Sequence, residues 1–378
     1  MRYFYDIRQI HVVVTTACNL NCTYCYEHNK HASVADIQHT KKILTDYIAH
    51  NPTERLLVIF HGGEPLLHFD FMHDLCEWLW DTYGENRVLI SFVTNGTILT
   101  DNIKQWLLKN KTRVFVSVSL DGLPTVHNRS RCNSFEKIDL PFFQSLYAHM
   151  PVKMTVPPSE LEHLYEGFLF LYKKGFIPDV ALAAETDFNE AHKQVLIQQL
   201  QLLIEFYKTH YDLAVTEFLF FPFERLSPSF PDLHWKKHRC GILDARLALD
   251  TEGNRYPCQT FISDFKATYN EAAINNVFER VQTENWSEII PTCAGCSVGE
   301  ICAPCYGLNY SYRGAIDKIN PRMCESTKIV AMASAVIWAH ILLNQENYKW
   351  LKESSPDLLG HRLIGVNNFL HRINEQEP

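Results

Sequence analysis

The sequence lacks the features of a nucleic-acid-binding or a secreted chain. No run of Lys or Arg forms a basic stripe, and the net charge of -8 over 378 residues is mild. We therefore expect no nucleic-acid partner. A secretory signal needs an unbroken apolar region, but charges at Arg2, Asp6 and Arg8 interrupt residues 1–14. We therefore expect a cytoplasmic protein.

Long apolar runs are also missing. The longest, residues 329–343, contains Ser334 and His340 and is shorter than the ~17 to 25 residues that span a bilayer. We expect a packed helix there and no membrane partner. With 46% hydrophobic and 21% charged residues, the composition is that of a soluble globular protein. The length allows two or three domains of roughly 150 residues.

Cysteine is the residue type that the sequence has in excess. A cytosolic compartment keeps thiols reduced, and a chain of this length has enough core to fold without covalent staples. The twelve cysteines are therefore better explained as metal ligands than as a disulfide framework. Most of them fall into two groups, residues 18–25 and 240–324.

The first half of the chain alternates between β-branched segments and segments with helical spacing. The predicted strands are residues 9–15, 55–60, 88–93, 114–119, 152–156 and 180–184. The predicted helices are residues 36–49, 71–83, 100–110, 134–149, 160–174 and 189–210. Six successive β-α units predict an α/β fold, a partial (β/α)6 TIM-type barrel with its chemistry on the loops after the strands.

The alternation stops after residue 211, and residues 218–238 are rich in Pro and aromatic residues. Few strand or helix signals occur in the cysteine-rich part that follows, apart from residues 246–250, whereas residues 326–343 are helical. The predicted organisation is a barrel, a linker, a small loop-rich metal-binding domain, and a C-terminal helix with its tail, at residues 1–212, 213–239, 240–325 and 326–378.

The first cysteine group directly follows the first predicted strand. Cys18, Cys22 and Cys25 form CxxxCxxC within one short loop. Three thiolates can hold three irons of a [4Fe-4S] cluster and leave the fourth iron open to another ligand. The alternative is a zinc site completed by His28 or His31, although zinc usually takes Cys in CxxC pairs.

This arrangement, with the aromatic Tyr24 before its last Cys, resembles the signature of the radical S-adenosylmethionine (radical SAM) superfamily. The resemblance implies that S-adenosyl-L-methionine chelates the open iron through its amino and carboxylate groups. It also implies that an electron from the reduced cluster cleaves the sulfonium, and that the resulting 5'-deoxyadenosyl radical abstracts hydrogen from a substrate. The protein would supply orientation and exclude solvent.

The motif HGGEP at residues 61–65 follows the second predicted strand and resembles the family's GGE element, which meets the methionine ammonium. Adjacent glycines allow the backbone to approach a ligand closely, and a carboxylate at Glu64 can pair with a cation. The third strand ends in TNG, which contains Asn95. Each of these motifs alone is more often a plain turn.

SLDG at residues 119–122, followed by His127 and Arg131, is similar to a pattern in peptide-modifying members of the family. In those members the Ser and the Arg lie near the ribose and the methionine carboxylate. Asn128 stands where the usual pattern has Asp. The resemblance implies that the cofactor-binding residues are Tyr24, Gly62, Gly63, Glu64, Asn95, Ser119 and Arg131.

The second group resembles the seven-cysteine SPASM extension, which holds two auxiliary [4Fe-4S] clusters. Gly253 lies between its first two cysteines, and two residues rather than three separate Cys302 from Cys305. From spacing alone, a zinc ribbon fits equally well. The metal-binding cysteines predicted for this group are Cys240, Cys258, Cys293, Cys296, Cys302, Cys305 and Cys324.

The resemblance divides these ligands between two clusters. Four thiolates complete the outer cluster, namely Cys293, Cys296, Cys302 and Cys324. The inner cluster keeps only Cys240, Cys258 and Cys305, so we expect an open iron there in preference to Cys132 as a fourth ligand. Free cysteines such as Cys76 are commonly small buried hydrophobic residues. Three [4Fe-4S] clusters and S-adenosyl-L-methionine are therefore the expected cofactors.

The resemblance points to a maturase of a ribosomally made precursor peptide, which forms a crosslink or excises backbone atoms. The predicted barrel starts near Met1, so we expect either leader recognition by a separate protein or no need for a leader. We also expect an electron donor such as flavodoxin or ferredoxin. Sulfatase maturation to formylglycine ranks second. Those enzymes have an Asp that acts as the catalytic base at the position of Gln259, and an amide cannot accept the substrate proton. A non-catalytic iron-sulfur or zinc scaffold is the third alternative. No catalytic residue is assigned.

Overall fold

The computed structural model describes residues 8–27, 30, 32–50, 55–210, 219, 221–229, 240, 242, 246–262, 271–302, 304–343, 352–353 and 356–376. The chain divides into two compact units. The first comprises Met1–Thr155, Phe170–Pro178 and Gly241–Thr283, and the second comprises Val156–Leu169, Asp179–Cys240 and Glu284–Pro378. Of the predicted linker at residues 213–239, the structure describes residues 219 and 221–229.

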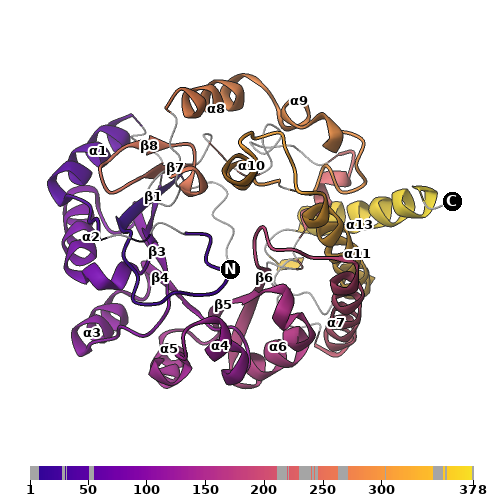
Figure 1. The fold of residues 1–378 in the computed structure, drawn as a ribbon, viewed down its shortest axis with the longest axis horizontal. Coiled ribbons are helices and arrows are strands. Elements are labelled where there is room, and N and C mark those ends of the chain that lie inside the picture. The colour runs from indigo at the N-terminus through magenta and orange to yellow at the C-terminus, as the bar shows by residue number, and fades with distance from the viewer. Residues whose placement is uncertain are drawn as a thin grey trace. The chain divides into compact units, whose positions relative to one another are not determined.

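One eight-stranded sheet confirms the predicted α/β class (Figure 1). Its order is β6-β5-β4-β3-β2-β1-β7-β8, so the sheet is open, and the pairings from β1 to β5 are parallel. The strands are β1 (Arg8–Thr15), β2 (Leu56–Gly62), β3 (Val88–Thr94), β4 (Val114–Ser119), β5 (Met150–Val156), β6 (Phe176–Leu182), β7 (Arg246–Leu249) and β8 (Arg255–Tyr256).

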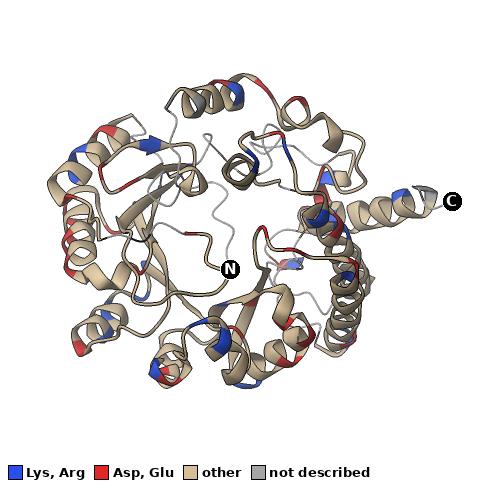
Figure 2. Cartoon of the chain, viewed as in Figure 1, with Lys and Arg blue, Asp and Glu red and all other residues tan. Residues whose placement is uncertain are grey.

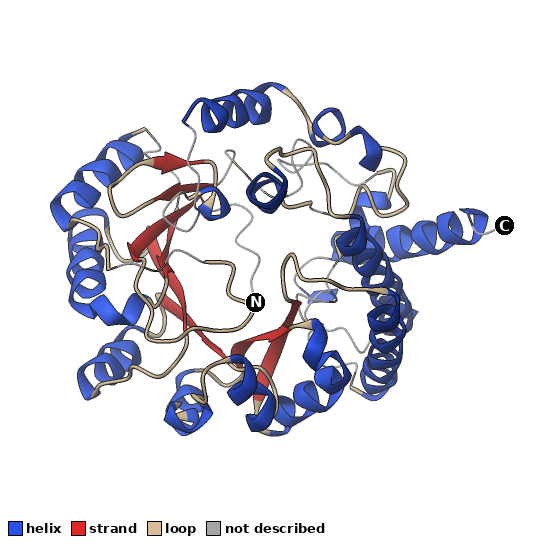
Figure 3. Cartoon of the chain, viewed as in Figure 1, coloured by secondary structure: helices blue, strands red, loops and turns tan. Residues whose placement is uncertain are grey.

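The sheet in the first unit is buried by helices on one face. Ile10, Val12 and Val14 of β1 are at most 1% exposed. Helices α1 (Ile37–Ala49), α2 (Phe69–Tyr83) and α3 (Asp101–Asn110) lie outside the strands (Figure 3). On the opposite face, Leu57 and Leu89 pack with Ile59 and Phe115. Because parallel strands end at one edge, the loops after β1 to β5 share that edge.

Residues 134–149 do not form the single helix that their spacing predicts. A 3-10 turn, η2 (Phe135–Lys137), precedes α5 (Leu140–Leu146). The Asp139 carboxylate caps α5 by accepting a bond from the Phe142 backbone N–H, and Pro141 in the first turn cannot continue a helix from before it. Strand β6 also starts before its predicted position, and it tolerates Pro178 because it is an edge strand.

The second unit is mainly helical. Helix α11 (Pro321–Leu343) extends the helix predicted at residues 326–343 and packs against α7 (Glu190–Thr209) and α13 (Pro356–Gln376). By length and composition α11 could cross a membrane, but 56% of its most apolar window is buried inside the protein. Its buried residues include Trp338, which is the arrangement of a core helix.

Most of the remaining helices are short. Helices α8, α9 and α10 lie in the stretch where the sequence gives few helix signals, and the 21-residue α13 was not predicted. Figure 2 shows Lys and Arg interspersed with Asp and Glu along the helices. The bounds are η1 (Pro65–His68), α4 (Pro124–Ser130), η3 (Pro158–His163), α6 (Leu164–Lys173), η5 (Phe223–Leu226), η6 (Gln259–Phe261), α8 (Glu271–Thr283), α9 (Trp286–Ile289), η8 (Pro291–Cys293) and α10 (Tyr306–Arg313).

Candidate active site

Cys18, Cys22 and Cys25 lie on the loop after β1, and all three are half-buried free thiols. A turn joins the last two, because the Cys25 N–H donates to the Cys22 carbonyl at 3.2 Å. Burial raises the pKa of Cys22 to about 11, and it also raises the pKa of Cys18. The Cys18 and Cys22 thiols are therefore neutral on their own, and a metal centre would supply the positive charge that keeps thiolates deprotonated.

The glycines of HGGEP hold this cysteine loop. The Gly63 N–H donates to the Thr15 carbonyl at 3.0 Å, and the Glu64 N–H donates to the Ala17 carbonyl at 2.9 Å. A Cβ on Gly63 would lie 2.2 Å from the Ala17 carbonyl oxygen, so only glycine fits. The sequence interpretation assigned these glycines to close approach of a ligand, whereas the structure shows close approach to the chain's own backbone.

Glu64 is fully buried at 1% exposure, and its carboxylate accepts three hydrogen bonds. Oε1 accepts from the Leu66 N–H at 3.1 Å and from the Thr94 hydroxyl at 2.8 Å, and Oε2 accepts from the Asn95 N–H at 2.7 Å. Burial raises the pKa of Glu64 to about 7 despite these donors. The side chain thus ties the loop after β2 to the end of β3.

Asn95 continues this connection to the cysteine loop. Its Nδ2 donates to Asn19 Oδ1 at 2.8 Å and lies 3.9 Å from Cys18 Sγ. Its Oδ1 accepts from the Thr97 N–H at 3.0 Å. The TNG motif therefore fixes the first cysteine of CxxxCxxC in place.

Asp121 is the centre of a buried ionic group beside the loop. Its Oδ2 accepts from the Tyr24 hydroxyl at 2.5 Å and from Arg131 Nε at 2.7 Å, and its Oδ1 accepts from the Thr155 N–H at 3.0 Å. The Arg131 guanidinium lies 5.3 Å from the centre of the Tyr24 ring. Burial raises the pKa of Tyr24, so its phenol is neutral and donates. Ser119 ends β4 near this group and is 7% exposed.

His127 and Asn128 shape the turn that presents Arg131. The Asp121 N–H donates to His127 Nδ1 at 3.3 Å, and His127 Nε2 lies 2.9 Å from the Ser134 hydroxyl. Burial lowers the pKa of His127 to about 4, so the ring is neutral. The Asn128 side chain accepts from the Phe135 N–H at 3.0 Å, a structural role in the turn.

The sequence interpretation missed a histidine–glutamate pair at this edge. His61 Nε2 lies 2.8 Å from Glu27 Oε1, and Glu27 is buried two residues after Cys25. The His11 ring lies edge-on to His61, with centroids 6.2 Å apart. Burial lowers the pKa of His11, and neither of its ring nitrogens has a hydrogen-bond partner among the described residues. The position of His61 directly before GGE was the available signal.

Cys132 also lies beside the first cysteine loop. Its Sγ accepts from the Asn21 N–H at 3.3 Å, and Asn21 directly precedes Cys22. The side chain is exposed, and Cys132 and Asn133 both have left-handed backbones with φ of 57° and 52°. Cys76, in contrast, is 0% exposed in α2, as expected of a small core residue.

Three of the predicted outer ligands are close enough to influence one another electrostatically. Burial is the main cause that raises the pKa of Cys293 and of Cys324. Repulsion from Cys324 and Cys296 adds to the shift of Cys293, and repulsion from Cys296 adds to the shift of Cys324. The turn needs Gly299, because a Cβ there would lie 2.2 Å from the Cys293 carbonyl oxygen. Cys302 follows in the same segment, where its N–H donates to the Val298 carbonyl at 2.7 Å.

The predicted inner ligands lie in different places along the two units. Cys258 belongs to the first unit and follows β8, where its Sγ lies 3.0 Å from the Thr260 hydroxyl. Cys305 and the half-buried Cys240 belong to the second unit, and Cys305 is the N-cap residue of α10. Over the described part of the chain, no three His, Cys, Asp or Glu side chains converge to hold a single ion. A cluster differs from zinc in this respect, because its cysteines bind separate irons.

Residues 12–139 match the family model of the Radical SAM superfamily. The cysteine-type anaerobic sulfatase-maturating enzyme of Clostridium perfringens (strain 13 / Type A) is 24% identical over 279 residues, which are 66% of this chain and 73% of that protein. Native anSMEcpe, solved with AdoMet and the Cp18Cys peptide, has a TM-score of 0.63 at 18% identity, over 86% of this chain and 96% of that one.

Streptococcus suis SuiB, solved with its precursor peptide SuiA, has a TM-score of 0.53 at 14% identity. This match covers 84% of this chain and 75% of that one. At such identities the two solved structures establish the shared fold alone. The match of residues 12–139 includes the cysteine loop and the motifs that follow β2, β3 and β4. Residues 12–139 of the chain are therefore similar to the radical SAM superfamily.

Proposed function

We propose that this chain is a radical SAM maturase that abstracts hydrogen from a ribosomally made precursor peptide. The observation that carries the proposal is the joining of four loops at one edge of the sheet. The loop with the three cysteines is tied to GGE by Gly63, to TNG by Asn95 and to SLDG by Asp121 through Tyr24. A scaffold that only holds metal would not need these additional connections.

Cys18, Cys22 and Cys25 would hold a [4Fe-4S] cluster in this proposal. When bound, the reduced cluster and S-adenosyl-L-methionine supply the 5'-deoxyadenosyl radical. Arg131 would attract the methionine carboxylate while Asp121 keeps its guanidinium in place. Glu64 would act mainly by fixing the Asn95 backbone, because both of its oxygens already accept hydrogen bonds.

The seven cysteines of the second group would hold two auxiliary clusters, with three thiolates for the inner one. We expect about twelve irons per chain after anaerobic reconstitution, from three four-iron clusters. About four irons with stoichiometric zinc would rule out the auxiliary clusters. The partners in this proposal are the peptide, a separate leader-binding protein and a flavodoxin or ferredoxin, in the cytoplasm.

Sulfatase maturation is the second candidate, favoured by the Clostridium perfringens relative. The residue after Cys258 does not fit sulfatase maturation. Gln259 is an amide, and its Oε1 is buried with no hydrogen-bond partner among the described residues. An amide cannot serve as the base of that oxidation, but it can orient a peptide group through hydrogen bonds.

Two substrates separate these candidates. The reconstituted enzyme is incubated with dithionite and S-adenosyl-L-methionine, either with a Cys-containing sulfatase peptide or with any short open-reading-frame peptide encoded beside its gene. We expect 5'-deoxyadenosine in step with a new crosslink or a backbone excision in the second peptide, seen by mass spectrometry. An aldehyde in the sulfatase peptide, with the other peptide unchanged, would establish the second candidate instead.

A further inference from the structure

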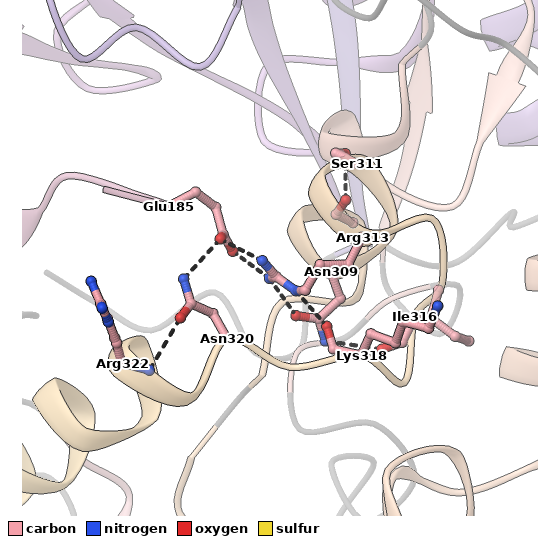
Figure 4. Close-up of polar contacts among 9 residues, drawn as sticks. Glu185, Asn309, Ser311, Arg313, Ile316, Lys318, Asn320 and Arg322 are labelled. Carbon is pink, nitrogen blue, oxygen red and sulfur yellow. Dashed lines mark hydrogen bonds and ion pairs between the residues drawn. The ribbon is translucent and has the colours of Figure 1, made fainter. Parts of the chain in front are cut away.

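Glu185 lies just after β6 and has an unusual backbone and side chain. Its φ of 57° is in the left-handed region, which is rare for a residue other than glycine. The carboxylate is only 7% exposed, yet it belongs to a loop. Oε1 accepts from Arg313 Nη2 at 2.7 Å, and Oε2 accepts from Arg313 Nη1 at 2.7 Å (Figure 4). Strained backbone that is held by a bidentate ion pair indicates a function for the side chain.

Arg313 is the last residue of α10, the helix that Cys305 caps at its other end. Its Nε donates to the Lys318 carbonyl at 2.7 Å, and its Nη2 also lies 3.2 Å from Asn309 Oδ1. Asn309 in turn donates to the Ile316 carbonyl at 2.9 Å. The guanidinium is therefore fixed from several sides, and through it Glu185 fixes the end of α10.

The same carboxylate reaches the start of α11. Asn320 Nδ2 donates to Glu185 Oε2 at 3.1 Å. Asn320 caps the helix, because its Oδ1 accepts from the Arg322 N–H at 3.1 Å and its carbonyl accepts from the Cys324 N–H at 3.1 Å (Figure 4). Glu185 thus holds the end of α10, which follows Cys305, and the start of α11, which contains Cys324.

Charge connects this network to the outer cluster. Arg313 is near enough to Cys324 to lower the pKa of that thiol, against the larger opposite effect of burial. Cys324 reciprocally raises the pKa of Arg313, although Glu185 is the main cause of that shift. A permanent cation therefore lies close to a proposed thiolate ligand, and a buried anion partly neutralises it.

We propose that Glu185 and Arg313 are positioning residues that set the reduction potential of the outer auxiliary cluster. Arg313 holds positive charge beside Cys324, Glu185 offsets that charge, and together they hold the start of α11, which carries Cys324. Reduction adds an electron to the cluster, so a nearby cation favours it and a nearby anion opposes it. This inference rests on the auxiliary clusters of the proposed function.

The test uses the full chain with Cys18, Cys22 and Cys25 changed to Ala, so that only auxiliary clusters remain. The potentials are measured by a redox titration followed by electron paramagnetic resonance. Arg313→Gln should make reduction of one cluster about tenfold less favourable, a fall of about 59 mV for one electron, and Glu185→Gln should raise the same potential. Arg313→Lys, which keeps the charge, should stay closer to the parent.

Glu205→Gln is the matched control, because Glu205 is an exposed carboxylate of α7 that pairs with Lys208. It should leave both potentials unchanged. A merely structural role would lower the melting temperature of both variants without moving the potentials in opposite directions. Unchanged potentials, or shifts of the same sign, in a parent with about eight irons would overturn the inference. A parent without iron would overturn the auxiliary clusters as well.

Discussion

At the scale of single residues, Arg131 and Asp121 form a buried ion pair, in which the Asp121 carboxylate needs the Arg131 guanidinium to balance its charge. Arg131→Ala leaves Asp121 without its charged donor and removes the group proposed to attract the methionine carboxylate. We expect S-adenosyl-L-methionine binding to weaken by about 1 to 3 kcal/mol in calorimetry. Arg129→Ala removes the same charge from an exposed position and should bind normally. Equal binding by both variants would show that the cofactor lies elsewhere.

Glu64 should make the stability of the folded protein depend on pH. Its pKa rises from 4.5 to about 7 on folding, because burial penalises the carboxylate. The folded state therefore holds this proton more tightly than the unfolded state, and stability falls as pH rises through that window. The loss amounts to about 3 kcal/mol above pH 7.

Glu64→Gln should remove this slope, because an amide does not titrate. At the acidic end of the window, where the parent is most stable, it should also lower the free energy of unfolding by about 1 to 3 kcal/mol, since one donor loses its acceptor. Urea unfolding of the reconstituted protein between pH 5.5 and 7.5 measures both effects. An undiminished slope in the variant would mean that another group titrates there.

At the scale of elements, the contact between the GGE turn and the cysteine loop decides whether the first cluster can be held. Gly63→Ala would place a methyl group 2.2 Å from the Ala17 carbonyl oxygen and would push the loop away. We expect the reconstituted variant to lose about four irons and to form no 5'-deoxyadenosine. Gly360→Ala is the control, because nothing lies within 4 Å of its added Cβ. Full iron content in the Gly63 variant would contradict this role.

The strands and helices of the first half were predictable because their signals are local. Five of the six predicted strands overlap β1 to β5 almost completely. The four residues of β7 join the sheet beside β1 through pairing with Gln9 to Val12, which no local pattern reveals. Pro141 marks the break between η2 and α5, whereas the prediction for residues 134–149 rested on helical spacing alone.

At the scale of the whole molecule, the motifs could be predicted from the sequence, but the hydrogen bonds and ion pairs between them could not. The sequence predicted which loops carry Glu64, Asn95 and Arg131. It did not predict that Glu64 would bind the chain's own donors, or that Tyr24 would join Asp121 across 97 positions. The pairing of His61 with Glu27 was missed for the same reason, because long-range contacts follow from the fold.

In the proposed function, the loop with Cys18, Cys22 and Cys25 holds the cluster that generates the 5'-deoxyadenosyl radical. The most direct measurement is 5'-deoxyadenosine formation by the anaerobically reconstituted protein with dithionite and S-adenosyl-L-methionine, compared with the variant in which all three cysteines are Ala. We expect 5'-deoxyadenosine from the parent and none from the variant, which should retain about eight irons. Cleavage that persists in the variant, or is absent from a fully loaded parent, would contradict it.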